Sequence, residues 1–298
     1  MRLKQVLITI FFLSIINSGN SQVYLGIIQK EGILLSETVK KSKIPYEVYE
    51  KELEKLSSNR FETIIFDNIQ EEFVKYTNIQ IGDKYYVSCS ENTTRESVSG
   101  YIIYTFLDRE FYPLISNKNN LCKINNYDYS LDYRNLVILS EDSIFNKINI
   151  APMYDDDLKT TFRERIFQDA KNFEVYTDYT ATLKEKIKEV LNDELTVFRG
   201  SFCNKFQEEY FVSYKIQNET EFVNANYVMN SNAKVIEFFT TPRKVFEYRE
   251  IIGICDYDND GLDEILISIG YYEGGGYELW KFDEGKFIMV AEGFYFGV

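Results

Sequence analysis

The sequence contains no histidine, and this absence removes several kinds of active site. Without an imidazole the chain cannot build a Ser-His-Asp triad, a Cys-His dyad or a zinc site with histidine ligands. Only four prolines and one tryptophan occur in 298 residues, and no glycine–serine tract or convincing internal repeat marks a linker or an array. The four cysteines form no CxxC pair, so neither a zinc ribbon nor a thioredoxin-like redox site has support.

Aromatic residues are abundant, with 24 tyrosines and 23 phenylalanines, and this apolar surface indicates a folded core rather than disorder. The net charge of −14 repels phosphate backbones, which argues against nucleic acid as a partner. An acidic surface also suits divalent cations, although a merely soluble surface has the same composition.

The first residues have the pattern of an export signal. Two basic residues precede an apolar run from Val6 to Ile16, and the small residues Gly19 and Ser21 define a cleavage site. The run is shorter than the roughly 20 residues that span a bilayer, and no later stretch reaches that length. We therefore predict a signal peptide at 1–21 and a secreted or periplasmic mature protein with no integral membrane segment after cleavage.

Export exposes the cysteines to oxidising conditions, in which disulfides form. Cys89, Cys122, Cys203 and Cys255 allow three pairings, and the sequence does not choose among them. Cys255 adjoins an apolar run, so a buried thiol is as compatible with its position as a disulfide.

The hydrophobic pattern predicts a mainly β protein with a few helices (α+β) and antiparallel sheets. We expect a β-rich N-terminal region at 22–150, a helical segment at 151–194 and an antiparallel β region at 195–298. Strands are expected at 23–28, 33–35, 61–66, 85–89, 101–107, 136–139, 196–202, 209–216, 222–229, 234–240, 250–255, 264–269, 277–282 and 287–290.

Helices are expected after Pro45, from Leu158 to Ala170, and from Thr182 to Leu191. The three aspartates at 155–157 invite a metal interpretation, but aspartate also caps helix N-termini and complements the helix dipole. We interpret them as the cap of the helix that follows.

The sharpest motif runs from Asp256 to Glu264 and reads DYDNDGLDE. Asp256, Asp258, Asp260 and Glu264 stand at positions 1, 3, 5 and 9, and a glycine at position 6 permits the turn that returns the chain. Calcium takes six to eight oxygen ligands, and carboxylates so close together repel one another unless a cation lies between them. The motif therefore predicts a Ca²⁺ site, to which Leu262 contributes its carbonyl oxygen.

A helix–loop–helix calcium site needs an acid at position 12, where this chain has Ile267 inside an apolar strand. The strand–DxDxDG–DE–strand pattern instead resembles the calcium loop of FG-GAP/VCBS-type repeats, the blade units of integrin-α-like β-propellers. The resemblance covers residues 251 to 298, about one blade, and implies the five ligands named above. It also implies that Asp263 faces solvent or holds the loop through hydrogen bonds. A full propeller repeats the loop, and this sequence has one.

Among the aromatic residues after the loop, Tyr271 and Tyr272 precede three glycines and Trp280 comes after them. The pattern is typical of a flexible hairpin, and the aromatic rings also suggest a contact surface for a carbohydrate or a protein. Overall, the sequence favours a secreted, calcium-stabilised, non-enzymatic protein that binds an unknown protein or carbohydrate, or that serves as a structural domain in an assembly. A carboxylate-based hydrolase, such as a glycoside hydrolase, is the alternative.

Overall fold

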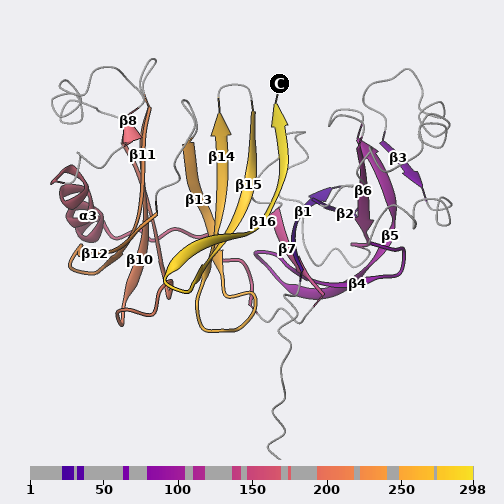
Figure 1. Cartoon of the computed structure of the whole chain (residues 1–298), viewed down its shortest axis with the longest axis horizontal. Helices are drawn as coiled ribbons and strands as arrows, with labels where there is room; N and C mark the ends of the chain where they lie inside the picture. The colour runs from indigo at the N-terminus through magenta and orange to yellow at the C-terminus, as the bar shows by residue number, and fades with distance from the viewer. Residues whose placement is uncertain are drawn as a thin grey trace, which may run out of the picture.

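The computed structural model describes residues 22–29, 32–36, 63–66, 79–104, 110–117, 136–141, 146–168, 174–175, 193–217, 222–239, 248–271 and 274–297. These residues form antiparallel strands and one helix (Figure 1). The structure therefore confirms the mainly β, antiparallel fold class. The predicted signal peptide and the helices expected after Pro45 and at 182–191 lie outside the described residues.

The N-terminal strands are β1 (Val23–Gln29), β2 (Gly32–Leu35), β3 (Thr63–Phe66), β4 (Lys84–Ser88), β5 (Thr93–Tyr104), β6 (Glu110–Ile115) and β7 (Leu136–Ser140). Helix α3 (Asp156–Gln168) and the short β8 (Glu174–Val175) follow. The C-terminal strands are β9 (Asp193–Gly200), β10 (Glu209–Gln217), β11 (Phe222–Asn230), β12 (Val235–Phe239), β13 (Tyr248–Cys255), β14 (Glu264–Tyr271), β15 (Gly274–Asp283) and β16 (Lys286–Gly297).

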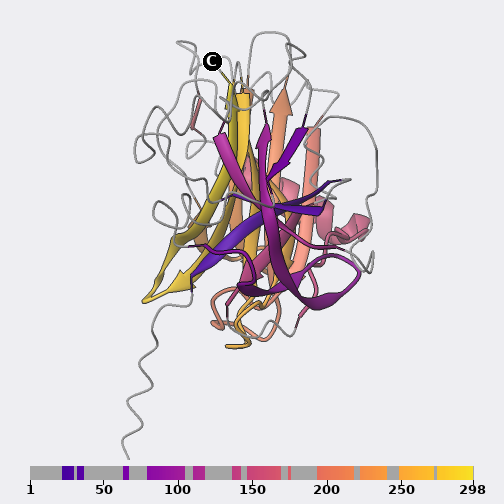
Figure 2. The ribbon, with the colours of Figure 1, turned by 90° about the vertical axis from the view of Figure 1, so that its right-hand side faces the viewer.

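The N-terminal strands close into a six-stranded barrel in the order β1-β2-β6-β5-β4-β7, and β3 adds to the outer edge of β5 (Figure 2). Closure depends on the length of β5, whose first half pairs with β4 and whose second half pairs with β6. The change of partner occurs where the register shifts between Val98 and Gly100, because a β-bulge bends a strand.

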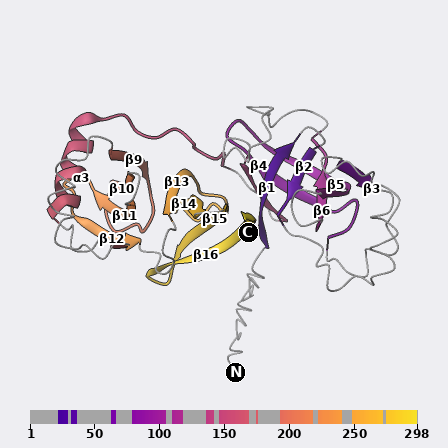
Figure 3. The ribbon, with the colours of Figure 1, turned by 90° about the horizontal axis from the view of Figure 1, so that it is seen from above.

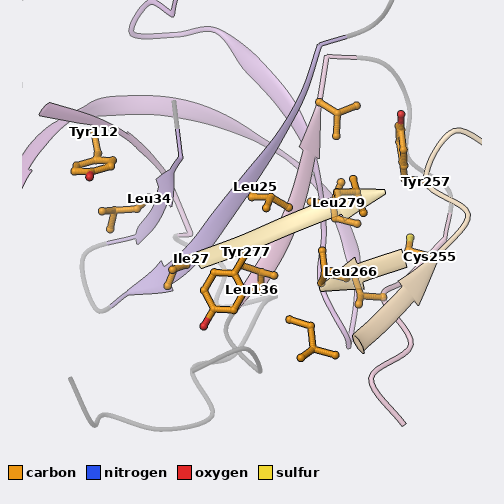
Figure 4. Close-up of a cluster of buried hydrophobic side chains, with 14 residues drawn as sticks. Leu25, Ile27, Leu34, Tyr112, Leu136, Cys255, Tyr257, Leu266, Tyr277 and Leu279 are labelled. Atoms are coloured by element: carbon orange, nitrogen blue, oxygen red, sulfur yellow. The ribbon is translucent and has the colours of Figure 1, made fainter. Parts of the chain in front are cut away.

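The sequence of strand β7 is continuously apolar because both faces of the strand are buried. Val137 and Leu139 fill the barrel interior, while Leu136 and Ile138 point outward into a second core (Figure 4). A strand buried on both faces loses the polar alternation that a half-exposed strand keeps.

The C-terminal strands form one sheet of β9–β12, which the short β8 joins by pairing with β11, and a second, four-stranded sheet of β13–β16. Within β9–β12 and within β13–β16 each strand pairs with the next along the chain. We call β9–β12 the first meander sheet and β13–β16 the second meander sheet. Figure 3 shows four layers in succession, namely α3, the first meander sheet, the second meander sheet and the barrel. The described residues thus form two facing sheets and a barrel, not a ring of blades.

The second meander sheet is the central layer and is buried on both faces. Ile265 and Ile267 pack against Phe211 of the first meander sheet. Leu266 and Leu279, on the opposite face, pack against the outer side of the barrel. The loop between β13 and β14 is attached to this central layer and lies beside both of its neighbours.

Several boundaries differ from the sequence-based expectations. Strand β5 begins at Thr93, not at 101, because the polar stretch before Tyr101 pairs with β4 although it lacks apolar alternation. Strand β6 was not expected, since Pro113 argues against a central strand. The glycines at 274–276 belong to β15 and pair with β14, so they are not the hairpin turn.

The aspartates before α3 act as predicted. Asp155 Oδ1 accepts the backbone N–H of Leu158 at 3.0 Å, which is an N-cap, and Asp156 and Asp157 fill the first turn. Phe162 and Ile166 then pack on the outer face of the first meander sheet.

Candidate cation site

The DYDNDGLDE motif forms the loop from β13 to β14, and the pairing of Cys255 with Glu264 closes it. Asn259 and Gly261 have φ values of 59° and 88°, so the chain turns twice through the left-handed region. A Cβ atom at Gly261 would meet nothing within 4 Å, which means that backbone conformation and not space requires the glycine.

Three carboxylates meet in this loop. Oxygen atoms of Asp256, Asp258 and Asp260 lie within 4.8 Å of one another. The backbone N–H of Asp260 donates to Asp256 Oδ1 at 3.1 Å, and that of Gly261 donates to Asp256 Oδ2 at 3.2 Å. The N–H of Leu262 donates to Asp260 Oδ1 at 2.8 Å. The loop amides therefore hold the aspartates, while the Oδ2 atoms of Asp258 and Asp260 contact the ammonium group of Lys281.

Glu264 is the buried member of the cluster, with 0% of its surface exposed. Its Oε2 accepts the N–H of Tyr257 at 3.0 Å, whereas its Oε1 is buried without a hydrogen-bond partner. Burial raises the pKa of Glu264 to about 9, and the negative charge of Asp258 adds to the shift. A buried carboxylate oxygen without a partner is costly unless a cation neutralises it.

The ammonium group of Lys281, on β15, is directed into the same cluster. Its Nζ contacts Asp258 Oδ2, lies 2.7 Å from Asp260 Oδ2 and lies 3.9 Å from Glu264 Oε1. Burial alone would lower the pKa of Lys281, but its hydrogen bonds to Asp258 and Asp260 outweigh that effect and raise it. An internal cation thus lies beside three of the predicted ligands.

Leu262 and Asp263, the two loop residues before Glu264, have different surroundings. Leu262, the predicted carbonyl ligand, is half-buried in the turn. Asp263 turns away from the cluster, and its Oδ2 accepts the N–H of Ser201 at 2.8 Å while its own N–H donates to the Ser201 carbonyl at 2.6 Å. Asp263 therefore holds the loop through hydrogen bonds to the first meander sheet.

The loop from β9 to β10 is similar to the loop from β13 to β14 in its length and in its first left-handed turn, although it has no second left-handed turn at the position of Gly261. Gly200 pairs with Glu209 as Cys255 pairs with Glu264, so the two loops have the same length. Asn204 has a φ of 52°, close to the 59° of Asn259 at the equivalent position. Sequence analysis missed this similarity, although an aromatic residue, an asparagine and a glutamate recur with the same spacing.

The two loops differ in the number of backbone N–H groups that donate to their glutamates. Glu209 is fully buried and accepts five backbone N–H groups, at 2.6–3.3 Å, from the loop residues Phe202, Cys203, Asn204, Lys205 and Phe206. In the second loop only the N–H equivalent to that of Phe202, from Tyr257, reaches the glutamate. The N–H groups of Asp260 and Gly261, equivalent to those of Lys205 and Phe206, donate to aspartates instead. These aspartates have no counterpart among Ser201, Cys203 and Lys205.

Of the three aromatic residues predicted as a contact surface, Trp280 is the one whose side chain the structure describes. The Trp280 indole is partly buried between the two meander sheets, and its N–H donates to Glu278 Oε2 at 2.7 Å. Glu278 also pairs with Arg249 at 3.1 Å. Tyr271 ends β14, and Tyr272 lies outside the described residues.

The cysteines fall into two kinds. Cys89 is disulfide-bonded, whereas Cys203 and Cys255 are buried and form no disulfide. Burial raises the pKa of the Cys255 thiol to about 12, which makes it unreactive. Cys255 is therefore a buried thiol, one of the two alternatives that the sequence left open.

Within the part of the chain that the structure describes, no helix has the length and apolarity to cross a membrane. Comparisons with protein-family models, with curated proteins and with solved structures give no match to this chain. The evidence for its function is therefore the geometry of the loop itself.

Proposed function

We propose that the protein is exported and that Ca²⁺ bound in the loop from Asp256 to Glu264 stabilises it for a non-enzymatic role in binding or in structure. The observation that carries the proposal is the Glu264 Oε1 atom, which is buried beside three aspartates and has no hydrogen-bond partner. The ligands would be Asp256, Asp258, Asp260, the Leu262 carbonyl and Glu264, all of them the hard oxygen donors that calcium prefers.

The loop from β9 to β10 supplies an internal comparison. There a loop of the same length surrounds a buried glutamate with amide groups, and the carboxylate accepts five N–H groups. In the loop from β13 to β14 aspartates accept two of the equivalent amides and the glutamate accepts one, which supports a cation as the partner of the ionised glutamate. A cation bound in the loop would explain why the loop carries additional acidic side chains that compete with the glutamate for its amide donors.

The position of the loop indicates a stabilising role. Tyr257 packs into the core between the second meander sheet and the barrel, and Asp263 bonds to the first meander sheet. A cation that fixes the loop thereby strengthens both contacts of the central layer. Extracellular calcium modules work with dissociation constants of about 10⁻⁴–10⁻³ M, and binding to the folded state alone adds to stability.

Two of the three buried glutamates among the described residues give the hydrolase alternative no support, and the third, Glu264, belongs to the proposed cation site. Glu209 is held by five amides, and Glu278 is held by Arg249 and by the Trp280 indole. Carboxylates engaged in this way serve the fold rather than a general acid or nucleophile. The partner of the protein, a protein or a carbohydrate, stays a prediction.

Thermal unfolding of the mature chain with calcium and with excess chelator tests the proposal. We expect a higher melting temperature in calcium for the wild type and a much smaller difference for the variants Asp256→Asn and Asp260→Asn. Asp283→Asn, in the exposed β15–β16 turn, is the matched control and should retain the full calcium effect. Equal melting temperatures of the wild type in calcium and in chelator would contradict the proposal.

A further inference from the structure

We infer that Lys281 is a built-in competitor for the cation, so that a divalent ion enters the loop by displacing the lysine ammonium from the carboxylates. This inference rests on the proposed function and concerns the regulation of the same site. It identifies the residue that sets the affinity of the site and its preference for divalent over monovalent cations.

The geometry of Lys281 matches that of a cation ligand set. Its ammonium contacts Asp258, lies 2.7 Å from Asp260 Oδ2 and is 3.9 Å from the unpartnered Glu264 Oε1. These three acids belong to the predicted calcium ligands, and the same oxygens cannot serve both cations at once. The ammonium and a divalent ion therefore exclude each other.

The charge of each cation determines whether the lysine ammonium or a metal ion occupies the carboxylate cluster. The single ammonium pairs with Asp258 and Asp260, and Asp256 belongs to the same cluster, so the three aspartates leave an excess of negative charge around it. A divalent ion brings twice the charge of the ammonium and takes six or more oxygens, whereas an ammonium has three donors. A monovalent ion carries the same charge as the lysine, so its binding does not offset the loss of the lysine's contacts with the carboxylates. We therefore expect sodium and potassium to leave Lys281 in place.

The lysine side chain has a route out of the site. It is 17% exposed, and the Asp258 and Asp260 side chains around it are 31% and 38% exposed. A long, flexible side chain at such a position can return its ammonium to water without disturbing the strand that carries it. The loop then has two ordered states, with Lys281 as the counter-ion at low calcium and with the divalent ion at high calcium.

The variant Lys281→Gln tests the inference through calcium titrations, read by calorimetry and by the shift in melting temperature. Removal of a hydrogen-bonded competing charge should tighten calcium binding about ten- to a hundredfold, since each tenfold corresponds to about 1.4 kcal/mol and charge-assisted hydrogen bonds contribute about 1.5–3 kcal/mol. The same variant should melt at a lower temperature than the wild type in chelator. Lys286→Gln, an exposed change of equal charge on the same hairpin, should alter calcium affinity less than about threefold.

A measurement on the wild type keeps the test independent of how the variants fold. Acetylation of Lys281, followed by mass spectrometry, should be faster in calcium than in chelator because the displaced ammonium becomes exposed; Lys286 should react equally in both. Calcium binding that Lys281→Gln does not strengthen, or a Lys281 reactivity that calcium leaves unchanged, would overturn this inference alone. Absence of calcium binding in both proteins would overturn the proposed function as well.

Discussion

Glu209 and Glu264 occupy the same place in two loops of equal length, yet they need different partners. Five backbone amides surround the first, while the second has one amide, a nearby ammonium and an oxygen with no hydrogen bond. The difference follows from the side chains of the two loops. In the second loop aspartates accept two amides whose equivalents in the first loop donate to the glutamate. At the scale of single residues, amides of the first loop satisfy its glutamate, whereas under the proposed function a bound cation completes the second loop.

Glu209→Gln should destabilise the protein by about 2–4 kcal/mol, because an amide nitrogen would replace one of the two oxygens that the loop N–H groups surround. Urea unfolding curves measure the loss, which should be equal in calcium and in chelator. The neighbouring Glu208→Gln, whose side chain is 41% exposed in its pair with Arg199, should cost less than about 0.5 kcal/mol. A calcium-dependent cost for Glu209→Gln would contradict the division of roles between the loops.

The pH dependence of stability should reveal Glu264. Burial raises its pKa from 4.5 to about 9, so over this range the cation-free folded chain keeps a proton that the unfolded chain has lost. The unfolded state binds fewer protons there, and stability in chelator therefore falls as the pH rises through the range. Calcium binds the charged carboxylate, so the rise in melting temperature that it produces should grow between about pH 5 and about pH 8.

Glu264→Gln isolates this contribution. Near pH 7 the variant should melt close to the wild type in chelator, because the wild-type carboxyl is then still protonated, and it should lose most of the calcium effect. Glu284→Gln, in an exposed turn, should behave as the wild type does. A calcium effect that is equally large at about pH 5 and about pH 8 would show that no buried carboxylate titrates at the site.

At the scale of elements, the sequence predicts what periodicity and turn residues control. The strands of the two meander sheets lie close to their expected positions, because strong apolar runs separated by short polar turns define them. The motif also brings Asp256, Asp258, Asp260 and Glu264 to one loop as predicted, since their spacing is local.

The sequence does not reveal features that depend on contacts between distant segments. The polar first half of β5 forms a strand because it pairs with β4. Barrel closure also requires β6, in which Pro113 is a residue that argues against a central strand. Lys281 reaches the site from two strands beyond the loop, so the motif gives no sign of it. The similarity of the two loops was missed because the aspartates, the most conspicuous feature of the motif, are confined to one of them.

At the scale of the whole molecule, the loop from β13 to β14 connects three layers. Tyr257 inserts into the core that β1 and β7 share with the second meander sheet, in contact with the cluster that holds Leu25 and Leu136 (Figure 4). Asp263 bonds to Ser201 of the first meander sheet, and Asn146 Nδ2 donates to the carbonyl of Asp256 at 2.8 Å. Helix α3 packs on the far face of the first meander sheet and shares none of these contacts.

Calcium should therefore change local stability unevenly, and hydrogen exchange in calcium and in chelator measures the pattern. We expect slower exchange in calcium for amides that exchange through local opening in β1, in β7 and at Ser201, because an ordered loop holds Tyr257 and Asp263 in place. Exchange in α3 should change little. The Asp258→Asn protein, measured in parallel, should show no calcium effect in any of these segments. If the wild type slows only within residues 256–264, the loop does not couple the layers; if α3 slows as much as β1, the ion acts through global stability alone.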